Sequence, residues 1–554
     1  MSQYDKAAGD WETSDDAFGT SKLVDVPVFG LLPGFQLSLP GQPSMTRILR
    51  DVKRQEHSIR NMVASIVYDA TTFVRRVGRR YDGWPVYGNK RCGTWYVPPD
   101  MIPGQKTCYF KSTDGHVNEW SFSFARLNLH VALEASRRGG CVVVDATRRG
   151  KMFPDALSKT VPIWCAVLNT AIAVYRMDAG VGGEDGGDLE LPVWVPEAEA
   201  SQIEAKIDVW AMQLLDAGID EFETLAKEMT APLACVWAHP SHATLPEVGG
   251  LRQRRTVVVL ASASIHESRA RRTLVLENGE GETLLPFDYV AGAADDEESW
   301  AMGLTPGLMW ANYRDILADD GEERLVRRLV KECRAGDVDG PGEEQTSILT
   351  WVPGTGLGIA SWAYAVRHEE SLRESGAAIV SVSHRDLGDM LGCLPSAMTG
   401  SRTLAAGSVK SKDCRVMEMD AVDPNNVTRY CWIADGSSRK HPVVEYAPCA
   451  AAFVSHHASR GRDVVFVYDG VTESIAAALL LVAIISLFNL DEGKLSRTTE
   501  GYCVDLASGS IAPALGDAFS RDVFRTYVAK VTVRIPHIVL RKSVLKEVFN
   551  VFIR

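Results

Sequence analysis

Apolar residues recur three and four positions apart from Ile59 to Val77. This spacing gathers them on one side of a helix and predicts an amphipathic α-helix. Residues 1–43 are first polar and then rich in Pro and Gly, which is typical of a loose arm. An ordered domain is therefore predicted from residue 44 onward.

Short runs of consecutive apolar residues predict the strands. Such runs occur in CVVVDA, TVVVLAS, AAIVSVS and DVVFVYDG, and helical stretches separate them. Strands without polar alternation are typical of sheets that helices cover on both faces. The pattern predicts an α/β protein with a large N-terminal α/β domain at 44–423. Residues 424–554 are predicted as a smaller C-terminal domain with a strand, a loop, a long apolar helix and further helices.

Composition narrows the protein class only slightly. The chain has 554 residues, a net charge of -12 and 11 cysteines without a CxxC pair. The longest apolar run, Ile475 to Phe488, is shorter than the ~20 residues that cross a bilayer, and the acidic N-terminus does not resemble a secretory signal. We expect a cytoplasmic protein with reduced thiols, no membrane contact and no stable protein partner.

The first predicted helix carries a local excess of positive charge. Between Arg47 and Arg80, nine Arg and Lys residues face three acidic ones. A solvated helix face explains such a pattern, and a helix that contacts RNA phosphates is the alternative. The candidate nucleic-acid contacts are Arg75, Arg76, Arg79 and Arg80.

The stretch KSTDGH is the first candidate for chemistry. It consists of Lys111, Ser112, Thr113, Asp114, Gly115 and His116. Its ammonium and hydroxyl groups can donate to phosphate oxygens, and its carboxylate and imidazole can act as acid, base or metal ligand. A polar turn explains the same residues equally well. In ARLNLH, alternation with leucines would place Arg126, Asn128 and His130 on one face of a strand.

A basic loop follows the strand that is predicted to end at Asp145. Loops at the carboxyl ends of parallel strands bind ligands in open α/β sheets, and clustered Arg and Lys favour a polyanion. A helix beginning after Pro154 would present further polar side chains on one face, although a capped helix start is the alternative interpretation. The candidate residues are Thr147, Arg148, Arg149, Lys151, Asp155, Ser158 and Lys159.

A strand, a glycine-containing loop and an apolar helix near residue 470 form the third candidate. The start of a helix can bind an anion through its free N–H groups. The loop resembles the phosphate loop of tyrosine and dual-specificity phosphatases, but Val467 stands in the place of the nucleophilic Cys and Glu473 in the place of the phosphate-binding Arg. We therefore predict a phosphatase-like fold without phosphatase activity. The candidate phosphate contacts are Asp469, Gly470, Thr472 and Ser474.

The acidic run from Asp295 to Glu298 has two interpretations. Such a run is usually a solvated face, and Mg²⁺ binding is the alternative. WVPGTGLGIA lacks the residues of a nucleotide-binding loop and is predicted to be a turn.

Four segments between Arg91 and Asn169 closely resemble the fungal and plant initiator tRNA 2'-O-ribosyl phosphate transferases. They are RCGTWYVPP, CYFKSTDGH, RLNLH and VVVDATRRGKMFPDALSKTVPIWCAVLN. The resemblance implies a pentosyltransferase that moves ribosyl 5-phosphate from 5-phosphoribosyl 1-diphosphate to the 2'-hydroxyl of adenosine 64 in the T stem of initiator methionine tRNA, which excludes this tRNA from elongation. It also implies that the C-terminal domain is a phosphatase-like module. A noncatalytic tRNA-binding protein on a phosphatase-like scaffold is the alternative.

This chemistry assigns roles to the candidates. Glycosyl transfer from a diphosphate requires neutralisation of the leaving group, typically by Mg²⁺ with Lys or Arg, and an acceptor for the hydroxyl proton. Asp145 is predicted to orient the ribose hydroxyls or the metal. Asp114 or His116 is the predicted base, and the sequence does not rank them. The predicted phosphate contacts are Lys111, Arg148, Arg149 and Lys151.

Overall fold

The computed structural model describes most of the chain beyond residue 57. The described residues are 58–102, 107–148, 151–180, 188–265, 270–278, 281–318, 322–335, 349–383, 414–419, 428–434, 441–469, 472–491, 494–498, 504–505 and 510–553. The predicted arm at 1–43, Arg149 and Gly470 lie outside these ranges, so the predictions made for them are not tested.

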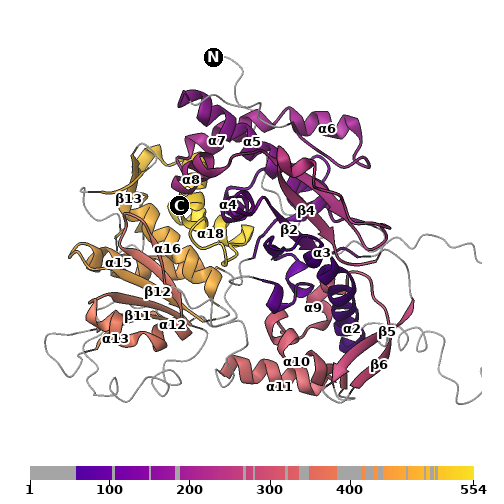
Figure 1. Ribbon diagram of the computed structural model, residues 1–554. Helices are drawn as coiled ribbons and strands as arrows, with labels where there is room; N and C mark the ends of the chain where they lie inside the picture. Colours follow the sequence, from indigo (N-terminus) through magenta and orange to yellow (C-terminus); the bar gives the residue numbers. More distant parts are fainter. Residues whose placement is uncertain are drawn as a thin grey trace, which may run out of the picture. The chain divides into compact units, whose positions relative to one another are not determined.

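A parallel sheet forms the centre of the N-terminal part (Figure 1). Its strands lie in the order β1, β2, β4, β3, and each neighbouring pair is parallel. The bounds are β1 Val86–Gly88, β2 Gly140–Asp145, β3 Leu233–Ala238 and β4 Thr256–Ser262. The predicted segments CVVVDA and TVVVLAS form β2 and β4, so the prediction of an α/β fold with a parallel sheet is confirmed.

The sheet is the middle layer between two hydrophobic cores. On β2, Val142 and Val144 belong to one core, and Cys141 and Val143 belong to the other. Both faces are therefore buried, which explains why the strands lack polar alternation.

Helices and one hairpin complete the two outer layers. The first core is covered by α2 (Ile59–Asp69), α10 (Pro306–Ala318), α11 (Glu322–Ala335), short α9 (Glu297–Trp300) and the hairpin of β5 (Arg271–Asn278) and β6 (Gly281–Asp288). The second core is covered by α4 (Leu129–Arg138), α5 (Val161–Asp178), α6 (Glu197–Glu204), α7 (Ile207–Asp216) and α8 (Asp220–Glu228).

The amphipathic helix predicted at residues 59–77 is present. The Ser58 hydroxyl caps its first turn by accepting from the backbone N–H of Asn61 at 3.2 Å. After α2 the helix continues through a π-helical turn, Ala70–Val74, into α3, Arg75–Arg80. The apolar stripe packs into the first core, which confirms the periodicity argument.

A second, mixed sheet is formed by strands from the later part of the chain. Its order is β10, β11, β9, β12, β8, β7, with β10 and β7 antiparallel to their neighbours. The bounds are β7 Thr350–Val352, β8 Leu357–Ser361, β9 Ala378–Ser383, β10 Cys414–Met419, β11 Thr428–Ala434 and β12 Val464–Tyr468. The predicted domain boundary at 423/424 passes through this sheet, because β7 to β10 precede it. A boundary just before β7 fits the strand pairing better.

The later part of the described chain contains six α-helices, one of which is almost entirely apolar. They are α12 (Trp362–Arg367), α13 (Glu369–Glu374), α15 (Pro442–Ala458), α16 (Glu473–Leu487), α17 (Arg521–Thr532) and α18 (Lys542–Ile553). The long apolar helix predicted from the sequence is α16, which contacts α15, α17, α18 and the sheet. Because it has neighbours on all sides, it needs no polar face.

Two short hairpins accompany these helices. One pairs β13 (Phe488–Asp491) with β14 (Lys494–Arg497), and the other pairs β15 (Val504–Asp505) with β16 (Ser510–Ile511). The predicted turn in WVPGTGLGIA connects β7 to β8, as expected from its glycines.

The C-terminal helices pack directly on the N-terminal part. The Lys530 ammonium donates to the Gly218 carbonyl at 2.6 Å, and Arg534 forms an ion pair with Glu221. The Thr532 hydroxyl lies 3.4 Å from the Phe124 carbonyl. The two sheets therefore belong to one unit, residues 56–554, rather than to independent bodies.

One interpretation of a short segment changes on this fold. The segment around Arg126, Asn128 and His130 is not a strand: a 3-10 turn ends at Arg126, Asn128 has a φ of 49°, and α4 begins at Leu129. The alternation of polar residues and leucines there comes from a turn that runs into a helix. Residues that favour turns easily override a strand prediction that rests on so short a pattern.

One continuous helix among the described residues has the length and apolar composition of a membrane span. It covers residues 156–178, and 83% of its most apolar window is buried inside the protein. Buried core helices share this composition, so α5 with its preceding turn is the central helix of the second core.

A buried carboxyl group links α2 to the hairpin side of the sheet. Asp69 accepts hydrogen bonds from the hydroxyls of Tyr289 and Ser264, each at 2.9 Å. Burial raises the pKa of Asp69 well above its ordinary value, although these hydrogen bonds act in the opposite direction. As pH rises above the ordinary pKa, the unfolded chain releases this proton before the folded protein does, so the stability falls.

We expect Asp69→Asn to remove this pH-dependent loss. The melting temperature of Asp69→Asn minus that of the original protein should increase from about pH 5 to about pH 8, because only the original protein has an ionisable group at this buried position. Thermal unfolding of both proteins across this range measures the difference. A difference that stays constant with pH would contradict the buried-acid assignment.

Candidate functional site

Candidate residues from distant parts of the sequence meet beyond the carboxyl end of β2. This edge of a parallel sheet is where open α/β proteins bind ligands. Asp145 ends β2, and the loop that follows leads to a π-helical turn at Ala156–Thr160. Such turns are frequent at functional sites because they displace side chains from the regular helix positions.

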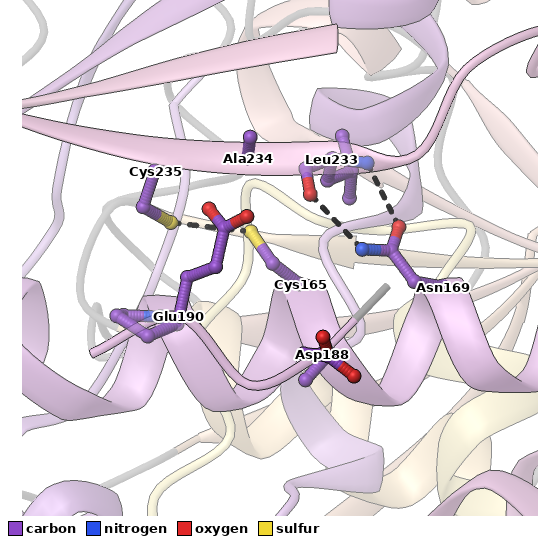
Figure 2. Close-up of a pocket in the computed structure, with 9 residues that line it drawn as sticks. Cys165, Asn169, Asp188, Glu190, Leu233, Ala234 and Cys235 are labelled. Carbon is purple, nitrogen blue, oxygen red and sulfur yellow. Dashed lines mark hydrogen bonds between the residues drawn. The ribbon is translucent and has the colours of Figure 1, made fainter. Parts of the chain in front are cut away.

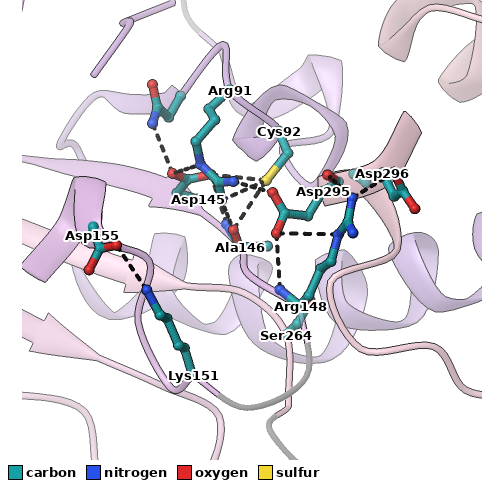
Figure 3. A network of polar contacts seen from close by, with 12 residues as sticks. Arg91, Cys92, Asp145, Ala146, Arg148, Lys151, Asp155, Ser264, Asp295 and Asp296 are labelled. Atoms are coloured by element: carbon teal, nitrogen blue, oxygen red, sulfur yellow. Dashed lines mark hydrogen bonds and ion pairs between the residues drawn. The ribbon is translucent and has the colours of Figure 1, made fainter. Parts of the chain in front are cut away.

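Asp145 is the buried centre of the first cluster (Figure 3). Its carboxylate accepts from Asn89 Nδ2 at 2.9 Å, Arg91 Nε at 2.9 Å, the Cys92 thiol at 3.0 Å and the backbone N–H of Ala146 at 2.9 Å. The side chain is fully buried. This burial argues against the predicted direct contact with ribose or metal, and it gives Asp145 a positioning role.

Arg91 joins Asp145 to the acidic run. Its guanidinium forms ion pairs with Asp145 and Asp295. Burial lowers the pKa of Arg91 and the two carboxylates raise it, with a net upward shift, so the charge is permanent. Burial also raises the pKa of the neighbouring Cys92 thiol, which keeps it protonated and unsuited to act as a nucleophile.

Arg148 extends this cluster toward the surface. Its guanidinium lies 2.6 Å from Asp296 Oδ1, and its backbone N–H donates to Asp295 Oδ2 at 3.1 Å. Gly292, with a φ of 62°, packs so closely on Thr147 that a Cβ there would collide with the backbone. The structure thus brings the acidic run next to the predicted basic loop, which the sequence alone did not indicate.

A second cluster forms around Asp155. The Lys151 ammonium lies 2.8 Å from Asp155 Oδ2, and the Lys159 ammonium lies 3.8 Å from Asp155 Oδ1 and 2.9 Å from Glu199 Oε1. His116 Nε2 lies 3.6 Å from Asp155 Oδ2. The KSTDGH stretch and the 155–160 turn, predicted as separate candidates, therefore meet at one place.

Close backbone packing holds these two segments together. Gly115 faces Asp155 and Thr160 so tightly that a Cβ would fall 2.9 Å from the Asp155 carbonyl and 2.8 Å from the Thr160 hydroxyl. The Thr160 hydroxyl donates to the Lys111 carbonyl at 3.1 Å. Within the described structure, the buried Ser112 hydroxyl has no hydrogen-bond partner. Only glycine allows this approach, so Gly115 places His116 beside Asp155.

The structure separates the two candidate bases that the sequence left open. Asp114 is buried, and its carboxylate accepts from Arg126 at 2.8 Å. His116 is 44% exposed and faces Asp155. An exposed imidazole oriented by a carboxylate suits proton transfer, whereas a buried carboxylate held by arginine does not.

The third candidate, at the start of α16, is satisfied by its own side chains. Asp469 Oδ1 accepts from the backbone N–H and the hydroxyl of Thr472, both at 3.0 Å. Asp469 Oδ2 accepts from the Ser383 hydroxyl at 2.9 Å, and the buried Ser474 hydroxyl is without a partner in the described structure. A carboxylate of the chain thus occupies the helix start, which favours a structural cap over phosphate binding.

The four candidate arginines at the end of the first helix differ in their surroundings. Arg75 binds Asp100 through two hydrogen bonds, and Arg80 pairs with Glu247. Arg76 lies over the Phe73 ring, and both Arg76 and Arg79 are exposed. Their role in nucleic-acid binding stays a prediction.

A narrow cavity lies apart from both clusters, between α5 and β3 (Figure 2). Its empty space of about 170 Å³ leaves no room for a water-sized sphere. The buried thiols of Cys165 and Cys235 approach to 3.6 Å beside Asn169 and Glu190. We interpret it as a packing gap rather than a ligand site.

Metal binding would depend on few protein ligands. Among the described residues, no group of three or more His, Cys, Asp or Glu side chains is placed to hold a metal ion. Asp295 and Asp296 are the carboxylates that contact Arg148 of the basic loop. Mg²⁺ commonly uses one or two carboxylates together with water and substrate phosphates, so this pair fits such a site.

Sequence reasoning missed Asn89, Arg91 and Cys92 as members of the site, and it considered Asp295 only within a separate acidic run. Arg91 is separated from Asp145 by 54 positions and from Asp295 by 204. No local pattern joins residues so far apart. The one feature that could have drawn attention is that Arg91 is a basic residue in a segment rich in polar and aromatic residues, RCGTWYVPP.

Comparison with known proteins adds to this geometry. The family described as the Rit1 N-terminal domain matches residues 52–333, which include both clusters. An uncharacterized protein of Schizosaccharomyces pombe is 38% identical over 281 residues, 51% of this chain and 58% of the relative. The tRNA A64-2'-O-ribosylphosphate transferase of Saccharomyces cerevisiae is 34% identical over 289 residues, 49% of this chain and 53% of the relative. The chain spans about half the length of these curated relatives.

Replacing Asp145 with alanine should strongly destabilise the protein. It would leave the buried Arg91 charge without its main partner, which costs about 3–5 kcal/mol of unfolding free energy. Urea denaturation of Asp145→Ala measures this cost. The matched control is Asp100→Ala, which breaks an exposed ion pair with Arg75 and should cost less than about 1 kcal/mol. Equal small losses would contradict the central role of Asp145.

Proposed function

The chain belongs to the Rit1 family, and from this membership we propose that it transfers ribosyl 5-phosphate from 5-phosphoribosyl 1-diphosphate to the 2'-hydroxyl of adenosine 64 in initiator methionine tRNA. The observation that carries the proposal is the His116–Asp155 pair beside the Lys151 ammonium. It combines a proton acceptor with a phosphate-binding cation in the region that matches the family.

Cations next to the paired carboxylates would bind the donor. Lys151 and Arg148 are exposed and pair with acidic side chains of the protein itself, and Arg148 also donates to the Asp295 carbonyl at 3.1 Å. A diphosphate carries more charge than a carboxylate and can take over these cations. Lys111 and Arg149 are proposed as further contacts, in line with the predicted donor loop.

The transfer is a substitution at C1 of the donor ribose. The tRNA 2'-oxygen forms a bond to C1, and the bond from C1 to the diphosphate oxygen breaks with its electron pair on the leaving diphosphate. His116 accepts the proton that the 2'-hydroxyl releases. Nε2 is turned toward Asp155, and Nδ1, which lies 4.0 Å from the exposed Glu119 carboxylate, is the nitrogen proposed to receive this proton.

Asp155 couples donor binding to the base. In this structure its carboxylate is shared among His116, Lys151 and Lys159. When the diphosphate draws Lys151 away, more of the carboxylate charge acts on His116. This would stabilise the imidazolium that forms during transfer.

Mg²⁺ is proposed as the cofactor, held by Asp295 and Asp296 next to Arg148. When bound, it would neutralise charge on the leaving diphosphate. The chain itself contributes Arg91, whose permanent charge fixes the position of Asp295.

The C-terminal part is proposed to be a phosphatase-like module that does not hydrolyse phosphate. Strand β12, the following loop and helix α16 have the element order of a phosphatase loop. Val467 at the nucleophile position is buried and lacks a thiol. Burial raises the pKa of Glu473, which replaces the phosphate-binding arginine. A helix start that carries Glu473 and is capped by Asp469 of the same chain suits a structural role rather than phosphate binding.

The proposal is tested by incubating the protein with initiator methionine tRNA, 5-phosphoribosyl 1-diphosphate and Mg²⁺. We expect the mass of one ribosyl phosphate to be added to a T-stem fragment that contains adenosine 64. Elongator methionine tRNA is the matched control and should stay unmodified. Binding of the tRNA without any mass gain would refute the transferase and favour the noncatalytic tRNA-binding alternative.

The base assignment predicts unequal effects of two neighbouring substitutions. His116→Ala should lower kcat by about 10²–10⁴-fold, because general base catalysis contributes this much. Asp114→Asn retains a hydrogen-bond acceptor for Arg126 and should lower kcat less than about tenfold. Single-turnover rates across pH measure both, and the rise of the rate with pH should disappear in His116→Ala. A larger loss in Asp114→Asn would identify Asp114 as the base instead.

A further inference from the structure

Trp194 is an exposed aromatic side chain next to the Asp155 cluster. It is 47% exposed, and its indole stacks on the Phe153 ring with centroids 4.9 Å apart and planes at 13°. One face lies on Phe153, so the exposed area belongs to the rest of the ring. Aromatic surface is thus presented to solvent.

Three contacts fix the orientation of this indole. Besides the Phe153 stack, the Trp237 ring lies at 77° to the indole with the ring centroids 6.0 Å apart. The Nε1 of Trp194 lies 3.4 Å from the Ser158 hydroxyl. Trp237 is itself held by a hydrogen bond from its Nε1 to the Leu157 carbonyl at 3.0 Å. The exposed face is therefore preorganised, and a ligand that stacks there does not have to order the ring.

Other apolar side chains are exposed around the same polar cluster. Met152 is 39% exposed beside Lys151, Val117 is 58% exposed beside His116, and Val193 is 99% exposed beside Trp194. Single exposed apolar residues are normal, but a group of them around polar functional residues is typical of a binding surface.

From this arrangement we propose that Trp194 stacks on a nucleobase of the acceptor RNA, at or beside the nucleotide that is modified. The inference rests on the proposed transferase function. The donor contains ribose and phosphates but no aromatic ring, so an aromatic face has no partner in the donor. Indole rings stack on any nucleobase, and such stacking is a common means of holding RNA.

The neighbouring groups match the other parts of a nucleotide. Phe153, which supports Trp194, lies two residues before Asp155, and Asp155 contacts both Lys151 and His116. The segment 151–155 thus brings together a face for the base on Trp194, the Lys151 cation for the phosphate and the His116 proton acceptor for the ribose hydroxyl. An apolar protein partner would use the face but would have no use for the other two groups.

Replacing the indole tests the stacking. In Trp194→Leu, the KM for tRNA should rise roughly 5- to 150-fold, as expected for the loss of one stacked base, while the KM for the donor stays unchanged. Trp194→Phe should restore most of the affinity. Trp351→Leu is the matched control, because Trp351 is 39% exposed on β7 of the other sheet, and its KM for tRNA should not change. Thermal unfolding verifies that all three variants are folded.

A tRNA that lacks the base of adenosine 64 or of one neighbouring nucleotide identifies the partner of Trp194. For one of these tRNAs, base removal should weaken binding to the original protein but cause no further loss in Trp194→Leu. Equal losses in both proteins for every position would overturn the stacking. Unchanged tRNA affinity in Trp194→Leu, with transfer intact in the original protein, would also overturn it while leaving the proposed function standing. Absence of transfer by the original protein would instead refute the function itself.

Discussion

The buried ion pair between Asp145 and Arg91 is the interaction on which the site depends. It joins the carboxyl end of β2 to the loop after β1, and through Asp295 it also holds the segment that follows the β5–β6 hairpin. A buried charge pair is tolerated only when the remaining hydrogen-bonding positions are filled. Asn89, Cys92 and the backbone of Ala146 fill them here. Three distant segments are thereby fixed at one edge of the sheet, and the basic loop starts from a rigid base.

Internal neutralisation explains how an acidic protein can present a site for polyanions. The three described cations of the donor loop and its helix, Arg148, Lys151 and Lys159, each pair with carboxylates. Without a ligand these pairs limit repulsion between the cations, and the exposed ones contribute little to stability. The proposed diphosphate donor would therefore meet cations that are positioned in advance and weakly held.

Much of the fold could be predicted because burial leaves a direct trace in the sequence. The strands β2, β4, β9 and β12 are short, mostly apolar runs, and α16 is apolar from Ile475 to Ile485 because neighbours surround it. The site was predictable only in part. Polar residues next to a strand end marked the two segments around His116 and Asp155, but the pairing of Asp145 with Arg91 has no local pattern. The strand predicted around Asn128 failed since a positive φ, which the alternation does not reveal, turns the chain into α4.

Glu473 shows why the C-terminal part can matter for a site that lies in the N-terminal part. A glutamate at the start of α16 disfavours phosphate, but its charge favours the buried ammonium of Lys90. Burial lowers the pKa of Lys90 and the Glu473 carboxylate raises it, and the net shift is downward. Lys90 also donates to the His537 carbonyl. It lies between Asn89 and Arg91, the two side chains that bind Asp145. Lys90 contacts His537 and is influenced by the charge of Glu473, so the C-terminal part adjoins the segment that carries Asn89 and Arg91 and can support the positioning of the proposed donor site.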